Sequence, residues 1–174
     1  MNIKHLVLSG GGQNLFNYIG IFDYLFENNI IDLQNIESIY ATSSGALIAS
    51  TVLLNYSWHD IKKYLINCNW ETKLDINVDN IMNIVSKNGI FDKSFYTIVY
   101  EPLLSGKDLS LNLTLEELYN ISKIDFHVFT TELNNFEVCD ISHSSHPNLK
   151  LLEALQMTSS FPLLISPLCI EDKY

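Results

Sequence analysis

ATSSG, from Ala41 to Gly45, is the stretch of sequence that decides the fold, because it sets a serine on a turn of small residues. A β-rich run, SIY at 38–40, precedes the turn, and ALIAS at 46–50 follows as an apolar helix. Such a strand–turn–helix lifts Ser43 clear of the backbone at a helix N-terminus, where the dipole favours developing negative charge. The pattern predicts a nucleophile elbow shaped by Ala41 and Gly45. The alternative is an ordinary turn between a strand and a helix.

A second motif lies upstream, LVLSGGG at residues 6–12, in which a short β-rich run ends in Gly10, Gly11 and Gly12. The segment 15–28 that follows has the apolar spacing of a helix. Glycines between a strand and a helix let backbone N–H groups approach an anion without a Cβ in the way. The loop could therefore bind a phosphate or the oxyanion of an acyl-transfer intermediate.

Nucleotide-binding alternatives for the glycine run fit poorly. The spacing G-x-G-x-x-G would need glycine at position 15, where Leu15 stands. The acidic residue of that motif should end the second strand, whereas Asp32 precedes it. No Gly-Lys-Ser or Gly-Lys-Thr follows the glycines either. These mismatches favour an oxyanion over a nucleotide.

Composition limits the class of protein. A length of 174 residues with 47% hydrophobic content favours a single domain spanning residues 1–174. The formal net charge of −10 excludes nucleic acid as a partner, because its phosphates would be repelled. No apolar run reaches the length of about 18 residues that a transmembrane helix needs, and no signal peptide is apparent. Three widely spaced cysteines are typical of reduced thiols, so we expect an intracellular protein, soluble or peripheral to membranes.

Apolar spacing and capping residues predict most of the secondary structure. Helices are expected at 15–28, 44–54, 57–68, 79–89, 93–104, 114–122 and 151–158. Strands are expected at 6–8 and 36–41, in a hairpin at 126–131 and 136–140, and in the apolar run at 163–170. This order predicts an α/β fold in which helices flank a mixed sheet.

Three motifs together resemble the patatin-like phospholipases: the glycine run, the Ser43 turn and ALQMTSSFP at 154–162. The resemblance covers essentially the whole chain. It implies a patatin-like three-layer sandwich, C-terminally truncated, that hydrolyses a lipid or phospholipid acyl ester with a Ser–Asp dyad. Ser43 would be the nucleophile, and Gly10, Gly11 and Gly12 would form the oxyanion and substrate-binding loop. No cofactor and no metal are implied.

The chain departs from the family pattern at three places. Asn14 stands where the family usually has Arg or Lys, and Ala41 replaces the first glycine of the serine turn. The Asp-Gly-Gly or Asp-Gly-Ala motif that would supply the base is absent, and in the family register it would follow beyond Tyr174. A serine hydroxyl is a poor nucleophile until a base takes its proton. Losing one member of such a unit costs about 10⁴ to 10⁶ in turnover.

A histidine base is an alternative to the missing aspartate. His143, in a polar loop after the hairpin, could pair with Ser43 if Asp140 or Asp125 oriented it. The simpler interpretation is that His143 and His146 are solvated loop residues. Both histidines lack Cys or carboxylate partners at ligand spacing, so no zinc site is predicted.

Two functional hypotheses remain open. The first is a patatin-like serine acyl hydrolase acting on lipid esters, with peripheral membrane contact. The second is a non-catalytic remnant that keeps the fold and binds lipid or protein. The final apolar run predicts an exposed edge, and hence self-association, in either case.

Overall fold

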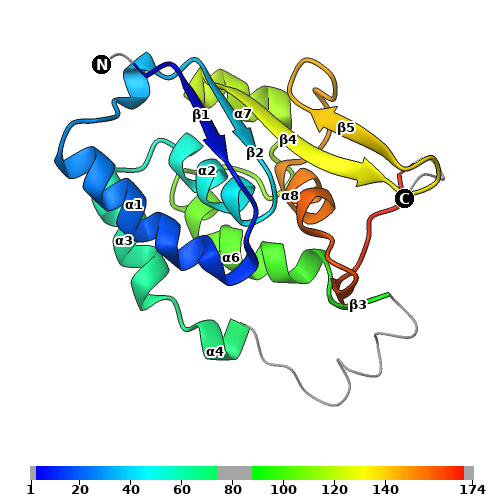
Figure 1. Cartoon of the computed structure of the whole chain (residues 1–174). Helices are drawn as coiled ribbons and strands as arrows, with labels where there is room; N and C mark the ends of the chain where they lie inside the picture. Colours follow the sequence, from blue (N-terminus) through cyan, green and yellow to red (C-terminus); the bar gives the residue numbers. More distant parts are fainter. Residues whose placement is uncertain (1–2, 74–87, 171–174) are drawn as a thin grey trace.

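Residues 3–73 and 88–170 are the part of the chain that the computed structural model describes, and a mixed β-sheet packed against helices forms its centre (Figure 1). Within these ranges the strands are β1 (His5–Leu8), β2 (Ser38–Ala41), β3 (Gly89–Phe91), β4 (Asp125–Glu132), β5 (Glu137–Ile141) and β6 (Leu163–Ile165). The helices are α1 (Leu15–Glu27), α2 (Ser44–Leu53), α3 (Trp58–Asn67), α4 (Trp70–Lys73), α6 (Lys93–Ser105), α7 (Leu115–Ser122) and α8 (Leu151–Ser159). Two short 3-10 turns, η1 (Gly12–Asn14) and η2 (Leu33–Asn35), complete the description.

The main sheet has the strand order β1-β2-β4-β5. β1, β2 and β4 run parallel, and β5 returns antiparallel from β4. Ala41 lies opposite Leu8 on β1 and Val128 on β4. Because the loops that follow parallel strands leave from the same edge of a sheet, the glycine run after β1 and the Ser43 turn after β2 emerge side by side.

One face of this sheet carries the main core. Ile39, Ala41, Phe126 and Val128 are at most 4% exposed and pack against α2 and α8. As its apolar sequence predicts, α2 is buried nearly all round, and its buried residues are Ser44, Gly45, Ala46, Ile48, Ala49, Ser50, Thr51, Val52 and Leu53. The helix that begins at the serine turn is therefore held on most sides.

Two buried tyrosines on α6 anchor the helices on either side of the serine turn. The Tyr100 hydroxyl lies 2.6 Å from the Ser50 hydroxyl on α2, and the Tyr96 hydroxyl lies 2.6 Å from the Ser159 hydroxyl on α8. Burial raises the pKa of Tyr96 to about 12, despite the opposing hydrogen bond with Ser159. Because neither tyrosine ionises near neutral pH, these anchors are constant over the physiological range.

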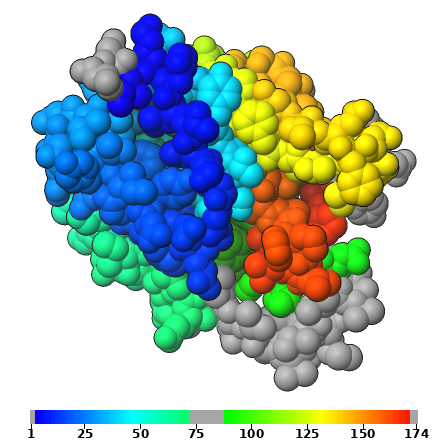
Figure 2. Space-filling view, viewed as in Figure 1, coloured from blue at the N-terminus to red at the C-terminus, as the bar shows by residue number. Residues whose placement is uncertain are grey.

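The opposite face of the sheet reaches the surface. In Figure 2 the dark blue β1, the cyan β2 and the yellow hairpin of β4 and β5 lie side by side on one side of the molecule. Val7 on β1 and Val138 on β5 are 79% and 76% exposed. Between them Tyr40 stacks on His127, with ring centroids 4.6 Å apart, and on Phe129 at 6.4 Å. We call this row of five residues the open sheet face.

The structure confirms the predicted α/β class with a mixed central sheet and helices, and it corrects details at Gly89 and in the run 163–170. The predicted helix from Asp79 falls on residues 79–87, outside the described ranges, and Gly89, its expected end, begins β3. The apolar run at 163–170 forms only β6, which pairs in parallel with β3 in a separate two-stranded sheet. The pairing is close, since a Cβ on Gly89 would lie 2.3 Å from the Ser166 nitrogen.

Candidate active site at the Ser43 turn

Ser43 has a backbone conformation that residues with a side chain rarely adopt. Its φ is 51° and its ψ is −123°, the values of the first central residue of a type II′ turn, where glycine is usual. Thr42 closes the turn by accepting a hydrogen bond from the Gly45 N–H at 3.0 Å. Such a conformation costs about 1–3 kcal/mol and persists only where the surrounding structure imposes it.

Hydrogen bonds to three parts of the fold impose this conformation. The Thr42 N–H donates to the Leu8 carbonyl at the end of β1, at 3.1 Å. The Ser43 N–H donates to Thr158 Oγ1 at the end of α8, at 3.0 Å. The Ser43 carbonyl accepts from the Leu47 N–H at 3.0 Å, which begins the hydrogen bonding of α2. The turn is thus tied to a strand, to its own helix and to a helix distant in sequence.

The small residues of the turn have different roles. A Cβ added to Gly45 would lie 2.4 Å from the Leu8 carbonyl oxygen, so only glycine fits where α2 crosses the end of β1. Ala41, in contrast, is a strand residue whose side chain is 1% exposed in the core between Leu8 and Val128. Alanine therefore fits at the position where the family pattern has glycine.

The glycine loop lies directly against Ser43. A Cβ added to Gly10 would be 3.1 Å from the Ser43 Cβ. Gly12 has a φ of +54°, in the left-handed region that glycine adopts at little cost. Within the described ranges, the backbone N–H groups of Gly10, Gly11 and Gly12 make no hydrogen bond. Unbonded N–H groups beside the serine can donate to an anion that forms there.

Residues of α1 and the preceding turn hold this loop in place. The Tyr18 hydroxyl donates to the Ser9 carbonyl at 2.7 Å, just before the glycines. Asn14 packs against Gly11, because a Cβ there would lie 2.8 Å from Asn14 Nδ2. Asn17 Nδ2 donates to Asn14 Oδ1 at 3.2 Å. Position 14 therefore places a neutral amide beside the loop, where the family pattern has a cation.

The Ser43 side chain is half-buried, and no described residue lies within hydrogen-bond distance of its hydroxyl. Nor do three His, Cys, Asp or Glu side chains converge to hold a metal ion anywhere in the described ranges. Among residues 3–73 and 88–170, the arrangement around Ser43 therefore consists of a strained serine and neighbouring N–H donors, with no base in contact.

The alternative of a Ser43–His143 pair is wrong. His143 Nδ1 lies 3.0 Å from Asp125 Oδ1, and Asp125 pairs with Ser38 at the start of β2. Ser43 follows the other end of β2, so the length of that strand, about 10 Å, separates the two sites. The sheet register puts Asp125 at the opposite end of β2 from the serine, and Asp140, which pairs with Phe129, lies 2.8 Å from His127 Nδ1.

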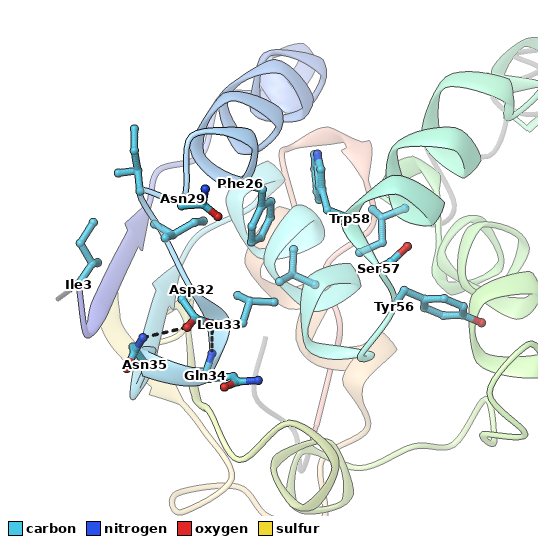
Figure 3. Close-up of a pocket in the computed structure, with 14 residues that line it drawn as sticks. Ile3, Phe26, Asn29, Asp32, Leu33, Gln34, Asn35, Tyr56, Ser57 and Trp58 are labelled. Carbon is cyan, nitrogen blue, oxygen red and sulfur yellow. Dashed lines mark hydrogen bonds between the residues drawn. The ribbon is translucent and has the colours of Figure 1, made fainter. Parts of the chain in front are cut away.

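A cavity of about 660 Å³ also lies away from Ser43 (Figure 3). It is lined by Phe26 at the end of α1, by residues 29–35 and by Trp58 at the start of α3. Asp32 in its wall caps η2 by accepting two hydrogen bonds of 3.0 Å. Because residues 29–35 precede β2 and Ser43 follows it, the cavity takes no part in the Ser43 site.

Thr158 is the contact residue that sequence reasoning left unassigned. It belongs to the ALQMTSSFP motif at 154–162, which carries the family resemblance but by itself assigns no role to Thr158. Thr158 lies 115 positions from Ser43 in sequence, so no local pattern connects the two. Its place in that motif, at the end of a buried helix, was the only available signal.

The fold and the motifs agree with the comparison to known families. Residues 6–174 match the family model of the patatin-like phospholipases. The chain belongs to the patatin-like phospholipase family. The matched region contains the glycine run, the Ser43 turn and the α8 motif, which are the three stretches that carried the resemblance in the sequence.

Individual relatives extend the comparison. An uncharacterized protein of Acanthamoeba polyphaga mimivirus is 26% identical over 169 residues, covering 97% of this chain and 55% of that protein. The crystal structure of VipD from Legionella pneumophila matches 98% of this chain and 44% of VipD, with a TM-score of 0.68 and 19% identity. ExoU of the Pseudomonas aeruginosa type III secretion system, solved in complex with SpcU, matches with a TM-score of 0.57 and 17% identity, over 92% of this chain and 39% of that chain. The two structures share the patatin-like fold, and the chain spans about half the length of these relatives.

Proposed function

We propose that this patatin-like domain is a serine acyl hydrolase for lipid esters, with Ser43 as the nucleophile and Gly10 to Gly12 as the oxyanion loop. The observation that carries the proposal is the strained conformation of Ser43, with φ 51° and ψ −123°, packed against N–H groups that have no partner in the described ranges. Strained backbone of this kind clusters at catalytic residues. An ordinary turn between a strand and a helix needs neither feature.

The chemistry follows from the geometry. The Ser43 oxygen attacks the ester carbonyl carbon, forming a C–O bond while the carbonyl electron pair moves onto its oxygen. The glycine N–H groups and the N-terminus of α2 stabilise that oxyanion. Collapse of the intermediate expels the alcohol and leaves an acyl-serine, which water hydrolyses to regenerate the hydroxyl.

The serine proton needs an acceptor, and the family resemblance implies an aspartate. The sequence contains no Asp-Gly pair, and in the described ranges no carboxylate reaches the Ser43 hydroxyl. We therefore test Ser43 through its reaction with an activated acyl or phosphonyl group.

Large apolar side chains near the end of the sheet where Ser43 lies support a lipid substrate and peripheral membrane contact. Phe136 in the β4–β5 hairpin loop is 79% exposed, and Phe161 and Leu163, which follow α8, are 69% and 63% exposed. Phe136 and Leu163 have positive φ values of 56° and 69°, so backbone strain accompanies their exposure. The net charge of −10 favours neutral over anionic bilayers. Among the helices of the described ranges, none has the length and apolar character to cross a bilayer.

A non-catalytic module that binds lipid or protein is the second candidate. The Ser43 hydroxyl, which has no hydrogen-bond partner in the described ranges, favours it, as does the amide of Asn14 where the family pattern has a cation. Such a module would retain the fold and the glycine loop but would not form a covalent acyl intermediate. Covalent reactivity at Ser43 therefore separates the two candidates.

A fluorophosphonate probe tests this reactivity. We expect the probe to label the wild-type chain and not the Ser43→Ala variant, with the adduct mapped to the turn by peptide mass spectrometry. Ser44→Ala is the matched control, because Ser44 is 2% exposed and its hydroxyl has no hydrogen-bond partner within the described ranges. Its removal should leave labelling unchanged. Absence of labelling in folded wild-type protein would reject the hydrolase and favour the binding module.

A further inference from the structure

We propose that Thr158 is the positioning residue that holds Ser43 in its strained conformation. The proposal rests on the proposed role of Ser43 as the nucleophile, and it concerns how the serine is held rather than which substrate it attacks. Thr158 does not touch the reacting atoms; it acts through the backbone N–H of Ser43.

The hydrogen bonds of the Thr158 hydroxyl have a defined direction. Its oxygen lies 2.6 Å from the carbonyl oxygen of Phe129 on β4 and 3.0 Å from the Ser43 nitrogen. A carbonyl oxygen only accepts, so the hydroxyl hydrogen of Thr158 must point to Phe129. The lone pairs of Thr158 are then available to the Ser43 N–H. The Thr158 hydroxyl therefore links the Phe129 carbonyl of β4 to the Ser43 N–H through two successive hydrogen bonds, which we call the relay.

This relay opposes relaxation of the turn. With ordinary negative φ at Ser43, the peptide between Thr42 and Ser43 would have to rotate, and its N–H would turn away from Thr158. Because Thr158 is 8% exposed, water has little access to replace the lost partner. The bond therefore stabilises the strained conformation against the relaxed one.

Thr158 is itself held rigidly enough to serve as an anchor. The hydroxyl of the next residue, Ser159, is hydrogen-bonded to the hydroxyl of the buried Tyr96 on α6. The Thr130 hydroxyl of β4 donates a hydrogen bond to the Met157 carbonyl at 2.9 Å. At the other end of α8, Lys93 and Glu153 form an ion pair of 2.9 Å. The position of the Thr158 hydroxyl is thus set by α6 and β4, not by the turn that it holds.

The test compares Thr158→Val, which keeps the shape but removes the hydroxyl, with Thr158→Ser, which keeps it. The readout is hydrogen–deuterium exchange of the Ser43 amide by NMR on the full chain, which requires no turnover. Thr158→Val should speed that exchange about tenfold, whereas Thr158→Ser should keep the Ser43 amide as protected as in the wild type. Thr130→Val is the matched control, because it removes a hydrogen bond between the same strand and helix without touching Ser43.

The fluorophosphonate labelling rate gives a second readout, with a loss expected for Thr158→Val and recovery for Thr158→Ser. Unchanged Ser43 exchange in Thr158→Val overturns the proposal, as does an equal increase in Thr130→Val, since Thr158 would then be only structural. If no variant labels but Ser43 exchange still follows the Thr158 hydroxyl, the hydrolase function fails while the positioning role stands.

Discussion

At the scale of single residues, the Ser43 turn depends on how closely separate backbone segments approach one another. Gly45 lets the first turn of α2 contact the end of β1, and Gly10 lets the glycine loop contact Ser43 itself. Because these Cβ atoms are absent, the glycine N–H groups that have no partner in the described ranges lie next to the serine. A side chain at either position would push apart the groups that the proposed chemistry needs together.

Gly45→Ala should therefore destabilise the fold by roughly 1–3 kcal/mol, because the added methyl would meet the Leu8 carbonyl oxygen at 2.4 Å. Urea unfolding followed by circular dichroism measures the change. Gly20→Ala on α1 is the control, since a Cβ there meets nothing within 4 Å and alanine favours a helix by about 1 kcal/mol. A Gly45→Ala variant as stable as wild type would show that the contact relaxes freely.

At the scale of elements, the edge strand β5 is attached to β4 partly through a histidine between two carboxylates. His127 Nδ1 lies 2.8 Å from Asp140 of β5, and its Nε2 lies 3.1 Å from Asp125 of β4. Asp125 also faces His143, at 3.0 Å. Partial burial disfavours the charged ring, but the hydrogen bonds to Asp140 and Asp125 outweigh it and raise the pKa of His127 above its ordinary value.

A raised pKa in the folded state gives this contact a defined pH dependence. Its stabilisation is fully present below the unfolded pKa of about 6.5 and is lost as pH rises through the higher folded value. We expect a loss of no more than about 1 kcal/mol above that range, because Asp140 is half-exposed and solvent screens the pair. Urea unfolding at a series of pH values should show the slope in wild type and in His59→Gln, an exposed control on α3. The same slope persisting in His127→Gln would contradict the assignment.

At the scale of the whole molecule, the distribution of apolar surface divides the sheet into two unlike faces. One face packs on α2 and α8, whereas the open sheet face presents Val7 and Val138 to solvent. The relatives compared are about twice as long as this chain. An apolar sheet face that is exposed over several strands favours association with another surface.

We accordingly expect the chain to self-associate at micromolar concentration, with the open sheet face as the contact. Light scattering coupled to gel filtration should give a mass that rises with concentration. The double variant Val7→Lys and Val138→Lys should lower that mass, and Ile66→Lys, at a 60% exposed position on α3, should not. A wild-type monomer at every concentration would exclude this contact.

The amino-acid sequence by itself predicted most of the helices and strands and the turn that carries Ser43. Local patterns predict three features: the small residues around Ser43, the glycines before α1 and the Thr114 capping box of α7. Each of them depends only on residues a few positions apart in the sequence. Only the tertiary structure decided what surrounds the serine. The bond between Ser43 and Thr158 joins residues 115 positions apart, and the sheet register separates Ser43 from His143. Such contacts depend on how strands pair and helices pack across the whole chain, and no short segment encodes that pairing.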